Sequence, residues 1–226
     1  MTSEPEWVFR ATGQCAHWAG INFGPERMTQ RAPSRSAVVG LLRSVFGKYE
    51  YRWEPSRVIF LRVPSMMPIM TNDMQSFDGG SPLVSTQRIR TFLYGIDIVI
   101  HAKITRATCA GPEDNLLKAH NMIESRARRG HRSYTPSFGP RECMAHLEWI
   151  ENGQLLPGLA PARINENLGN VFYDFDIDDP ERPAYLAPLE IKNGVVEYPS
   201  FDEVRKFGIR YNLPRVWPAE AMRVSP

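Results

Sequence analysis

Residues 92–106, FLYGIDIVIHAKITR, carry the longest strand pattern in the chain. Apolar side chains recur at every second position, which predicts a β-strand with one face in the core. They are Ile96, Ile98, Ile100, Ala102 and Ile104. The opposite face is mixed and carries Asp97, Val99, His101, Lys103 and Thr105.

Residues 114–130, DNLLKAHNMIESRARRG, follow this strand and predict an amphipathic helix. Asp114 or Asn115 can cap the first turn. Gly130 follows the last turn, where a left-handed residue is favoured. The apolar face carries Leu116, Ile123 and Ala127, with His120 on or near it.

The helix and the loop after it, up to residue 143, are rich in basic side chains. These are Lys118, Arg126, Arg128, Arg129, Arg132 and Arg141. One or two cations favour the end of a helix through its dipole, but six exceed that need. Together with Tyr134 and Phe138, they are typical of a site that holds phosphates and stacks bases. The alternative is a solvated helix face, because charge runs are common on surfaces.

The remaining N-terminal segments complete an alternation of strands and helices. Strands are predicted at residues 6–12, 57–63 and 143–150, and a helix runs from Ser34 to about residue 46. The proline-rich and glycine-bearing residues 64–90 predict a projecting hairpin or long loop. The order strand–helix–strand–excursion–strand–helix–strand predicts the α+β class. Its arrangement is that of a ferredoxin-like or RRM (split βαβ) domain, with an antiparallel sheet and both helices on one face.

The pattern changes after Gly158. Short strands are predicted at residues 171–177, 184–191 and 194–199, with Asn193-Gly194 as a hairpin turn. The proline-rich tail is expected to be extended. We therefore predict two parts: residues 1–152, the ferredoxin-like domain, and residues 153–226, a small β-rich, antiparallel appendage.

The formal net charge of +2 hides an uneven distribution. Residues 27–62 hold eight basic and two acidic side chains, whereas residues 171–204 hold nine acidic and two basic ones. Two separate basic blocks indicate an anionic partner, such as a nucleic acid. The acidic part is expected to face solvent or a basic partner.

Several classes of protein are not favoured. Cys15, Cys109 and Cys143 are odd in number and widely spaced, which argues against a disulfide framework or a zinc site and fits a reducing cytoplasm. The histidines form no ligand motif, so no metal or other cofactor is expected. Neither a membrane span nor a signal peptide is expected. Asp174, Asp176, Asp178 and Asp179 predict a solvated strand edge, with a metal cluster as the less favoured alternative.

RNA cleavage without a metal is chemistry that these residues allow. The reaction needs a base for the 2′-hydroxyl, a cation for the charged intermediate and an acid for the leaving oxygen. Lys118 and His120, early in the basic helix, could serve. Alternatively, Lys118 holds a phosphate and His120 is a packed, hydrogen-bonded core residue. The aromatic RRM signature is absent, so base stacking on the sheet face is not supported.

Five stretches carry a family resemblance. They are residues 25–48, PERMTQRAPSRSAVVGLLRSVFGK; residues 86–102, TQRIRTFLYGIDIVIHA; residues 114–130 followed by SFGPREC at 137–143; residues 168–177, LGNVFYDFDI; and residues 191–199, IKNGVVEYP. In this order they resemble the CRISPR-associated Cas-five family, the RAMP subunit of Cascade, in its type I-C-like variety. The most specific piece is SFGPREC, which is similar to that family's G-x-R-E signature.

The resemblance implies a ferredoxin-like domain with a hairpin and a small C-terminal β domain. It also implies a subunit of Cascade that holds the 5′ handle of the CRISPR RNA. There it would contact the backbone (Cas-seven) and large (Cas-eight) subunits and, indirectly, target DNA. In the type I-C variety the family also cuts the precursor RNA without metal. That cleavage site uses a tyrosine at the end of the first helix and a Lys-His pair opening the second.

This chain departs from that cleavage pattern. The tyrosine position is Phe46, which has no hydroxyl, and the lysine matches Lys118. The histidine position is Ala119, with His120 displaced by one residue, about 100° around a helix. Tyr49, Tyr51 or His120 could substitute for the missing groups.

Three hypotheses follow. The first is a handle-binding Cascade subunit, whose hairpin between residues 66 and 88 reaches a neighbouring subunit or kinks the RNA. Its RNA contacts would be Arg31, Arg35, Arg43, Lys48, Arg88, Arg90, Arg126, Arg128, Arg129, His131, Arg132, Tyr134 and Arg141. The second is a precursor-RNA endonuclease with Lys118 as electrostatic stabiliser, His120 as base or acid, and Tyr49 as a further candidate. The third is a purely structural assembly protein.

Overall fold

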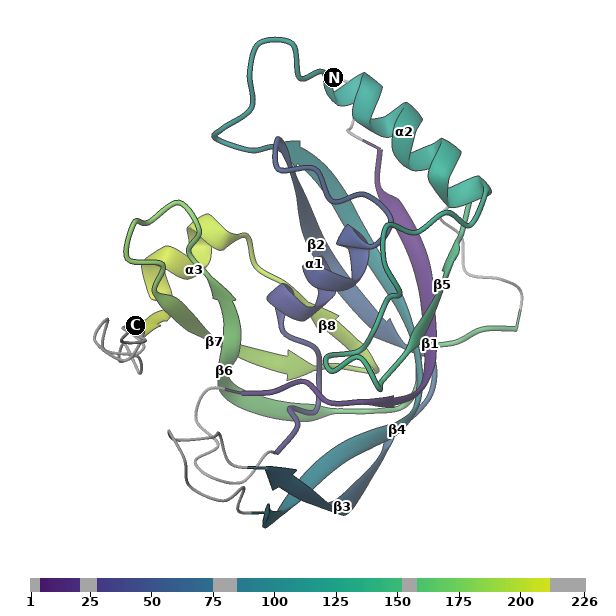
Figure 1. Ribbon diagram of the computed structural model, residues 1–226, viewed down its shortest axis with the longest axis vertical. Helices are drawn as coiled ribbons and strands as arrows, with labels where there is room; N and C mark the ends of the chain where they lie inside the picture. Colours follow the sequence, from purple (N-terminus) through teal and green to yellow (C-terminus); the bar gives the residue numbers. More distant parts are fainter. Residues whose placement is uncertain (1–4, 21–27, 75–84, 152–157, 212–226) are drawn as a thin grey trace, which may run out of the picture.

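The computed structural model describes residues 5–20, 28–74, 85–151 and 158–211. In this part of the chain, two antiparallel sheets and three helices form a mixed α/β fold (Figure 1). None of the described helices has the length and hydropathy needed to cross a lipid bilayer.

The first sheet has the strand order β5-β1-β4-β2-β8. The bounds of these strands are β1 Trp7–Ala16, β2 Tyr51–Phe60, β4 Ser85–Arg106, β5 Ala145–Trp149 and β8 Val195–Glu197. The predicted alternation in β4 is confirmed, because Ile96, Ile98, Ile100, Ala102 and Ile104 are all buried. Strand β2 begins before the predicted residue 57, since Tyr51 already pairs with Arg106.

The excursion between β2 and β4 is a regular hairpin. Strand β3 (Ser65–Met74) pairs with the first half of β4, from Ser65 opposite Tyr94 to Met74 opposite Ser85. This confirms the hairpin and excludes the loop alternative for these residues. The glycine pair at residues 79–80 lies outside the described residues. Met66, Met67 and Met70 are exposed along β3.

The two N-terminal helices begin where the sequence predicts caps, and α2 also ends where it predicts one. Helix α1 (Arg35–Arg43) is capped by Ser34, whose side chain accepts a hydrogen bond from Ala37 N. Helix α2 (Leu116–Arg128) is capped by Asn115 and followed by Gly130 at φ +64°. A positive φ favours glycine at this position. Helix α1 ends a few residues before the predicted residue 46.

Both helices bury their apolar stripes in one core. A single cluster joins Leu42 of α1 and Ile123 of α2 to Ile98 of β4. The opposite face of the first sheet buries only a small cluster, formed by Val8, Ile59, Val99 and Ile150. The helices therefore lie on the same side of the sheet, α1 against β2 and β6 and α2 against β4 and β5.

The second sheet has the order β6-β7-β9. Its strands are β6 Glu166–Phe175, β7 Ala184–Ile191 and β9 Ile209–Tyr211. Helix α3 (Phe201–Phe207) packs on β7 and was not predicted, although Ser200 and Glu203 form a capping box at its start. The predicted turn at Asn193-Gly194 is confirmed, with φ +48° and +78°, and leads into β8 of the first sheet. The predicted extended tail lies outside the described residues from 212 onwards.

Ion pairs join α1 and the first sheet to the second. Arg35, in the first turn of α1, is buried and pairs with Glu54 of β2 at 2.6 Å and with Asp174 of β6. Arg52 of β2 pairs with Asp178 at 2.5 Å. We call these five residues the inter-sheet cluster. Its geometry does not support Arg35 as a phosphate contact, because both sides of its guanidinium are occupied by carboxylates.

The acidic residues that follow are paired in the same way. Asp176 is buried and accepts hydrogen bonds from Arg205 of α3 at 2.7 and 2.8 Å, and Asp179 pairs with Arg210 at 3.2 Å. The prediction of a solvated acidic edge is therefore wrong. The four aspartates pair with arginines of the same chain, whereas Glu181 and Asp202 of the acidic block remain exposed.

We expect Asp178→Asn to weaken the fold in a pH-dependent way. The guanidinium of Arg52 holds the pKa of Asp178 well below its usual value. Such a group stabilises the fold above its unfolded-state pKa of about 4, and this stabilisation is lost as the pH falls further. Urea unfolding at pH 7 should show a loss of about 2 kcal/mol. The stability of the variant should also fall less steeply below pH ~4.

Asp202→Asn is the matched control. Asp202 also pairs with an arginine, Arg205, but its side chain is 82% exposed. Its replacement should change the free energy of unfolding by less than about 0.5 kcal/mol. Equal effects of the two variants would contradict a structural role for the inter-sheet cluster.

Candidate nucleic-acid interface

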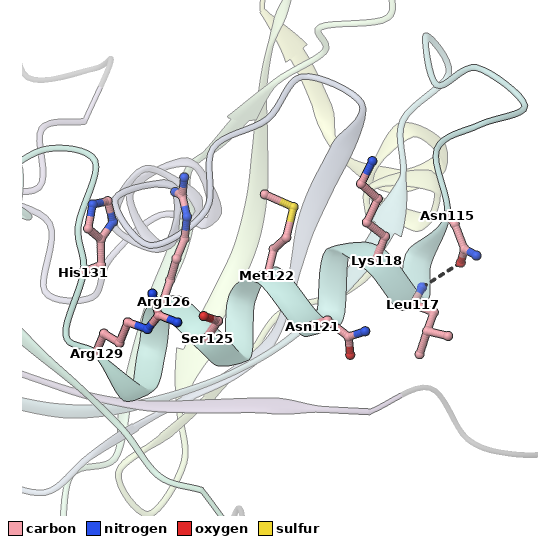
Figure 2. A pocket seen from close by; sticks show the side chains of 9 residues that line it. All are labelled: Asn115, Leu117, Lys118, Asn121, Met122, Ser125, Arg126, Arg129 and His131. Atoms are coloured by element: carbon pink, nitrogen blue, oxygen red, sulfur yellow. Dashed lines mark hydrogen bonds between the residues drawn. The ribbon is translucent and has the colours of Figure 1, made fainter.

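One flank of α2 lines an open groove, the α2 groove, with a volume of about 710 Å³. Figure 2 shows Lys118, Met122 and Arg126 rising from the same side of the helix. Their i, i+4 spacing places them in one row. The groove is lined by Asn115, Leu117, Lys118, Asn121, Met122, Ser125, Arg126, Arg129 and His131.

The core fixes which side chains face the groove. Ala119, Ile123 and Ala127 are buried against the sheet, as the apolar stripe requires. A residue one position earlier lies about 100° around the helix. Lys118, Met122 and Arg126 therefore form the row beside the buried stripe, and all three line the α2 groove.

Arg126 ties the groove to the end of α1. Its Nη1 donates to the carbonyl of Val45 at 3.0 Å and to Ser133 Oγ at 3.1 Å. Its guanidinium carbon lies 6.0 Å from the ring centroid of Phe46, within cation–π range. Arg126 is thus held in place by neutral acceptors, and these contacts leave its charge uncompensated.

The loop after α2 returns to α1. Ser133 N donates to the carbonyl of Ser44 at 2.7 Å, and the Tyr134 hydroxyl donates to the carbonyl of Gly40 at 2.6 Å. Burial raises the pKa of the Tyr134 hydroxyl, and the nearby charge of Arg43 partly offsets this. The two basic segments, distant in sequence, therefore meet at the end of α1.

Two cations of the α2 groove, Lys118 and Arg129, and Arg43, which lines another cavity beside α1, have no acidic partner among the described residues. No carboxylate of the described residues lies within 4.0 Å of Arg43, Lys118 or Arg129. All three side chains are exposed. Uncompensated cations beside the apolar Met122 and Leu117 suit an anionic partner that also carries apolar surface, such as a single-stranded nucleic acid.

Other basic residues of the predicted set are already paired. Arg31 pairs with Glu166 at 3.2 Å and Arg90 with Glu142 at 3.6 Å. Arg128 pairs with Glu124 at 3.0 Å and with Glu151. None of these arginines lines the α2 groove. The geometry therefore does not bring them together with Lys118.

The rest of the set does not line the groove. Lys48 and Arg141 are exposed, and Arg88 lies on the hairpin in β4. Arg132 turns towards β5, where its Nη2 donates to the carbonyl of Leu147 at 2.8 Å. Burial lowers the pKa of Arg132.

His120 lies on the other flank of α2. Its Nδ1 accepts a hydrogen bond from Trp7 Nε1 at 3.0 Å, so the neutral ring carries its proton on Nε2. It lines a second cavity of about 400 Å³, which it shares with Trp149 and Glu124. Lys118 and His120 therefore do not share a site, and the packed, hydrogen-bonded interpretation fits His120.

The positions that the resemblance gives to the cleavage groups are buried here. Phe46 is 1% exposed and Ala119 is fully buried. The hydroxyl of Tyr51 donates to the carbonyl of Asn115 at 3.1 Å, and burial raises its pKa. Tyr49 is 85% exposed in the segment between α1 and β2.

Sequence reasoning missed the neutral part of the groove. Asn115, Asn121 and Ser125 offer amide and hydroxyl groups along it, and Met122 forms its apolar floor between Lys118 and Arg126. Helical spacing between the predicted residues Lys118 and Arg126 could have found Met122, whereas the amides carry no charge signal. Across the described ranges, no three histidine, cysteine, aspartate or glutamate side chains are grouped to hold a metal ion.

Two relatives share most of this chain. One, named CRISPR pre-crRNA endoribonuclease Cas5d, from Mannheimia succiniciproducens, is 25% identical over 203 residues, covering 80% of this chain and 90% of the relative. A protein of the same name from Thermus thermophilus is 28% identical over 208 residues, covering 83% and 89%.

Two solved structures share the fold. A CRISPR-associated protein is 17% identical with a TM-score of 0.67, covering 88% of this chain and 94% of its own. A functionally uncharacterized protein from Streptococcus mutans is 15% identical with a TM-score of 0.64, covering 88% and 95%. At 17% and 15% identity, the similarity to these two structures shows a shared fold and nothing further.

The model of one protein family matches nearly the whole chain. This is the Cas5d model, described as CRISPR-associated protein (Cas_Cas5), and it matches residues 8–219. The match spans both sheets and all the described helices. The chain therefore belongs to the CRISPR-associated Cas5 family, the Cas-five family that its sequence resembles.

Proposed function

We propose that this protein is the CRISPR RNA-binding subunit of a type I, I-C-like Cascade complex and holds the 5′ handle of the guide RNA. The observation that carries the proposal is the α2 groove, where Lys118 and Arg129 stand without carboxylate partners among the described residues. The relatives named above are pre-crRNA endoribonucleases, which supports CRISPR RNA as the ligand.

The groove offers each type of contact that single-stranded RNA needs. Guanidinium and ammonium groups bind phosphates, whereas rings and apolar side chains stack against bases. His131 supplies a ring at one end, and Met122 supplies an apolar surface. The amides of Asn115 and Asn121 can hydrogen-bond the edges of unstacked bases.

The proposal extends to the finer fold and to protein partners. The order β5-β1-β4-β2, with α1 and α2 on one face, supports a ferredoxin-like domain in residues 1–152. Residues 153–226 would be its β-rich appendage, joined to it by the pairing of β8 with β2. The β3–β4 hairpin, with its exposed methionines, would contact the backbone or large subunit.

We expect Lys118→Ala combined with Arg129→Ala to weaken binding of repeat-derived RNA about tenfold at low salt. Each lost phosphate contact should also reduce the slope of log affinity against log salt by about 0.7. Fluorescence anisotropy over a series of salt concentrations measures both quantities.

Arg128→Ala is the matched control, because Arg128 belongs to the same helix but is already paired with Glu124 and Glu151. It should change the salt slope little. Weak binding of the unchanged protein that does not depend on salt would favour the purely structural assembly protein.

Metal-independent cleavage of precursor RNA is the second candidate function. The names of the relatives and the position of Lys118 in the groove favour it. Lys118 would stabilise the charge that develops on the phosphate, and the exposed Tyr49 hydroxyl is the remaining candidate for proton transfer.

Cleavage is tested with repeat RNA in EDTA, where products should end in a 2′,3′-cyclic phosphate. We expect Lys118→Ala to lower the cleavage rate by ~10²–10⁴-fold. His120→Ala should change it less than tenfold, because His120 faces the cavity beside Trp7. A loss with His120→Ala as large as with Lys118→Ala would return His120 to the catalytic set. If the unchanged protein forms no product, the cleavage hypothesis fails and RNA binding alone remains as the proposed function.

A further inference from the structure

We propose that Cys15 and Cys143 are a redox modification site, at which a reversible disulfide fastens the segment after α2 to strand β1. The two Sγ atoms lie 3.3 Å apart, although the residues are separated by 128 positions. Cys15 is half-buried near the end of β1, and Cys143 is buried two residues before β5. The inference is independent of the proposed function.

The sheet register sets the two cysteines opposite each other. The β1–β5 pairing runs from Phe9 opposite Trp149 to Gly13 opposite Ala145. Two further steps along the same register bring Cys15 opposite Cys143. Their proximity therefore follows from the antiparallel pairing of β1 with β5, although Cys143 itself lies in the bend that precedes β5.

The backbone hydrogen bonds show whether the two cysteines form a hydrogen-bonded or a non-hydrogen-bonded antiparallel pair. The N–H of Ala145 donates to Pro136 O at 2.9 Å and that of Cys143 to Pro140 O at 3.0 Å, so neither N–H is used for pairing with β1. The cysteines thus occupy a non-hydrogen-bonded position of the ladder. Opposite Cα atoms at such positions are about 4.5 Å apart, which lies inside the range that disulfides bridge.

The backbone around the pair is held in place. His17 N donates to Phe138 O at 3.0 Å, and Phe138 N donates to Cys143 O at 2.8 Å. Gly139 has φ +101°, and a Cβ there would stand 2.1 Å from the carbonyl oxygen of His17. The segment around Cys143 therefore sits directly on the end of β1, and bond formation needs only small side-chain rotations.

The chemistry is thiol–disulfide exchange with a small-molecule disulfide, such as oxidised glutathione. The thiolate of the more accessible Cys15 attacks one sulfur of the oxidant and expels the other as a thiolate. Cys143 then loses its proton and attacks the Cys15 sulfur, which expels the second small thiolate. The protein loses two electrons and two thiol protons, and the oxidant becomes two thiols.

The environments of the two thiols support this order. Burial raises the pKa of the Cys143 thiol to about 12, so Cys143 does not start the exchange. Its position beside Cys15 lets it complete the exchange inside the protein. The new bond would fix the end of the loop that carries Tyr134 and Arg141.

The test uses the full chain with Cys109→Ser, which removes the exposed third thiol. After treatment of the folded protein with oxidised glutathione, alkylation of the denatured protein should find both thiols lost. The intact mass should fall by two hydrogens, and dithiothreitol should restore both thiols. A persistent glutathione adduct on Cys15, or two thiols that still alkylate, would overturn the proposal.

Two further measurements separate bond formation from a folding defect. With Cys143→Ala added, Cys15 should retain glutathione as a mixed disulfide, because the resolving thiol is missing. In the protein with both cysteines, oxidation should raise the midpoint of urea unfolding, and reduction should return it. Oxidation should also slow tryptic cleavage at Arg141. If oxidation changes neither the urea midpoint nor the rate of tryptic cleavage at Arg141, the disulfide does not hold the segment after α2 against β1.

Discussion

The guanidinium of Arg35 between Glu54 and Asp174 is the interaction on which the rest of the structure depends. It joins the start of α1 to one strand of each sheet, and the side chains of Arg35 and Asp174 are only 9% and 13% exposed. A carboxylate left there without its partner would be destabilising, so the three groups must stay together. This fixes the position of α1, whose far end supplies Arg43 and the carbonyls that receive the loop after α2.

Helix α2 places Lys118 and His120, which are two positions apart, on different flanks, where they cannot act on the same group. Its buried stripe of Ala119, Ile123 and Ala127 divides the helix surface into two flanks. Lys118 lies on the flank of the α2 groove, whereas His120 lies on the flank facing Trp7. Because successive residues turn by about 100°, no small adjustment brings both side chains to one phosphate. Moving a side chain by a single position along the helix therefore places it in a different cavity. It does not merely change its orientation within the same one.

Local patterns could be predicted from the sequence, and long-range partners could not. The alternation in β4, the caps at Ser34 and Asn115, and the Asn193-Gly194 turn depend on neighbouring residues, and the structure confirms them. The pairing of Arg35 with Asp174 spans 139 positions. No local pattern distinguishes that arginine from Arg43, which keeps its charge exposed. The proximity of Cys15 and Cys143 was missed for the same reason, since it depends on the sheet register.

The carboxylates of the C-terminal part determine which basic side chains remain available to bind an anionic ligand. Within the described residues, Glu166, Asp174 and Asp178 pair with Arg31, Arg35 and Arg52 of the first basic block. The same ion pairs that hold the second sheet therefore neutralise one side of α1. Lys118 and Arg129 of α2 have no such partners among the described residues, so the positive potential gathers at the α2 groove and not over the whole surface. A net charge close to zero is thus compatible with a strongly basic site, because many of the carboxylates are paired with arginines in the ion pairs that join the two sheets.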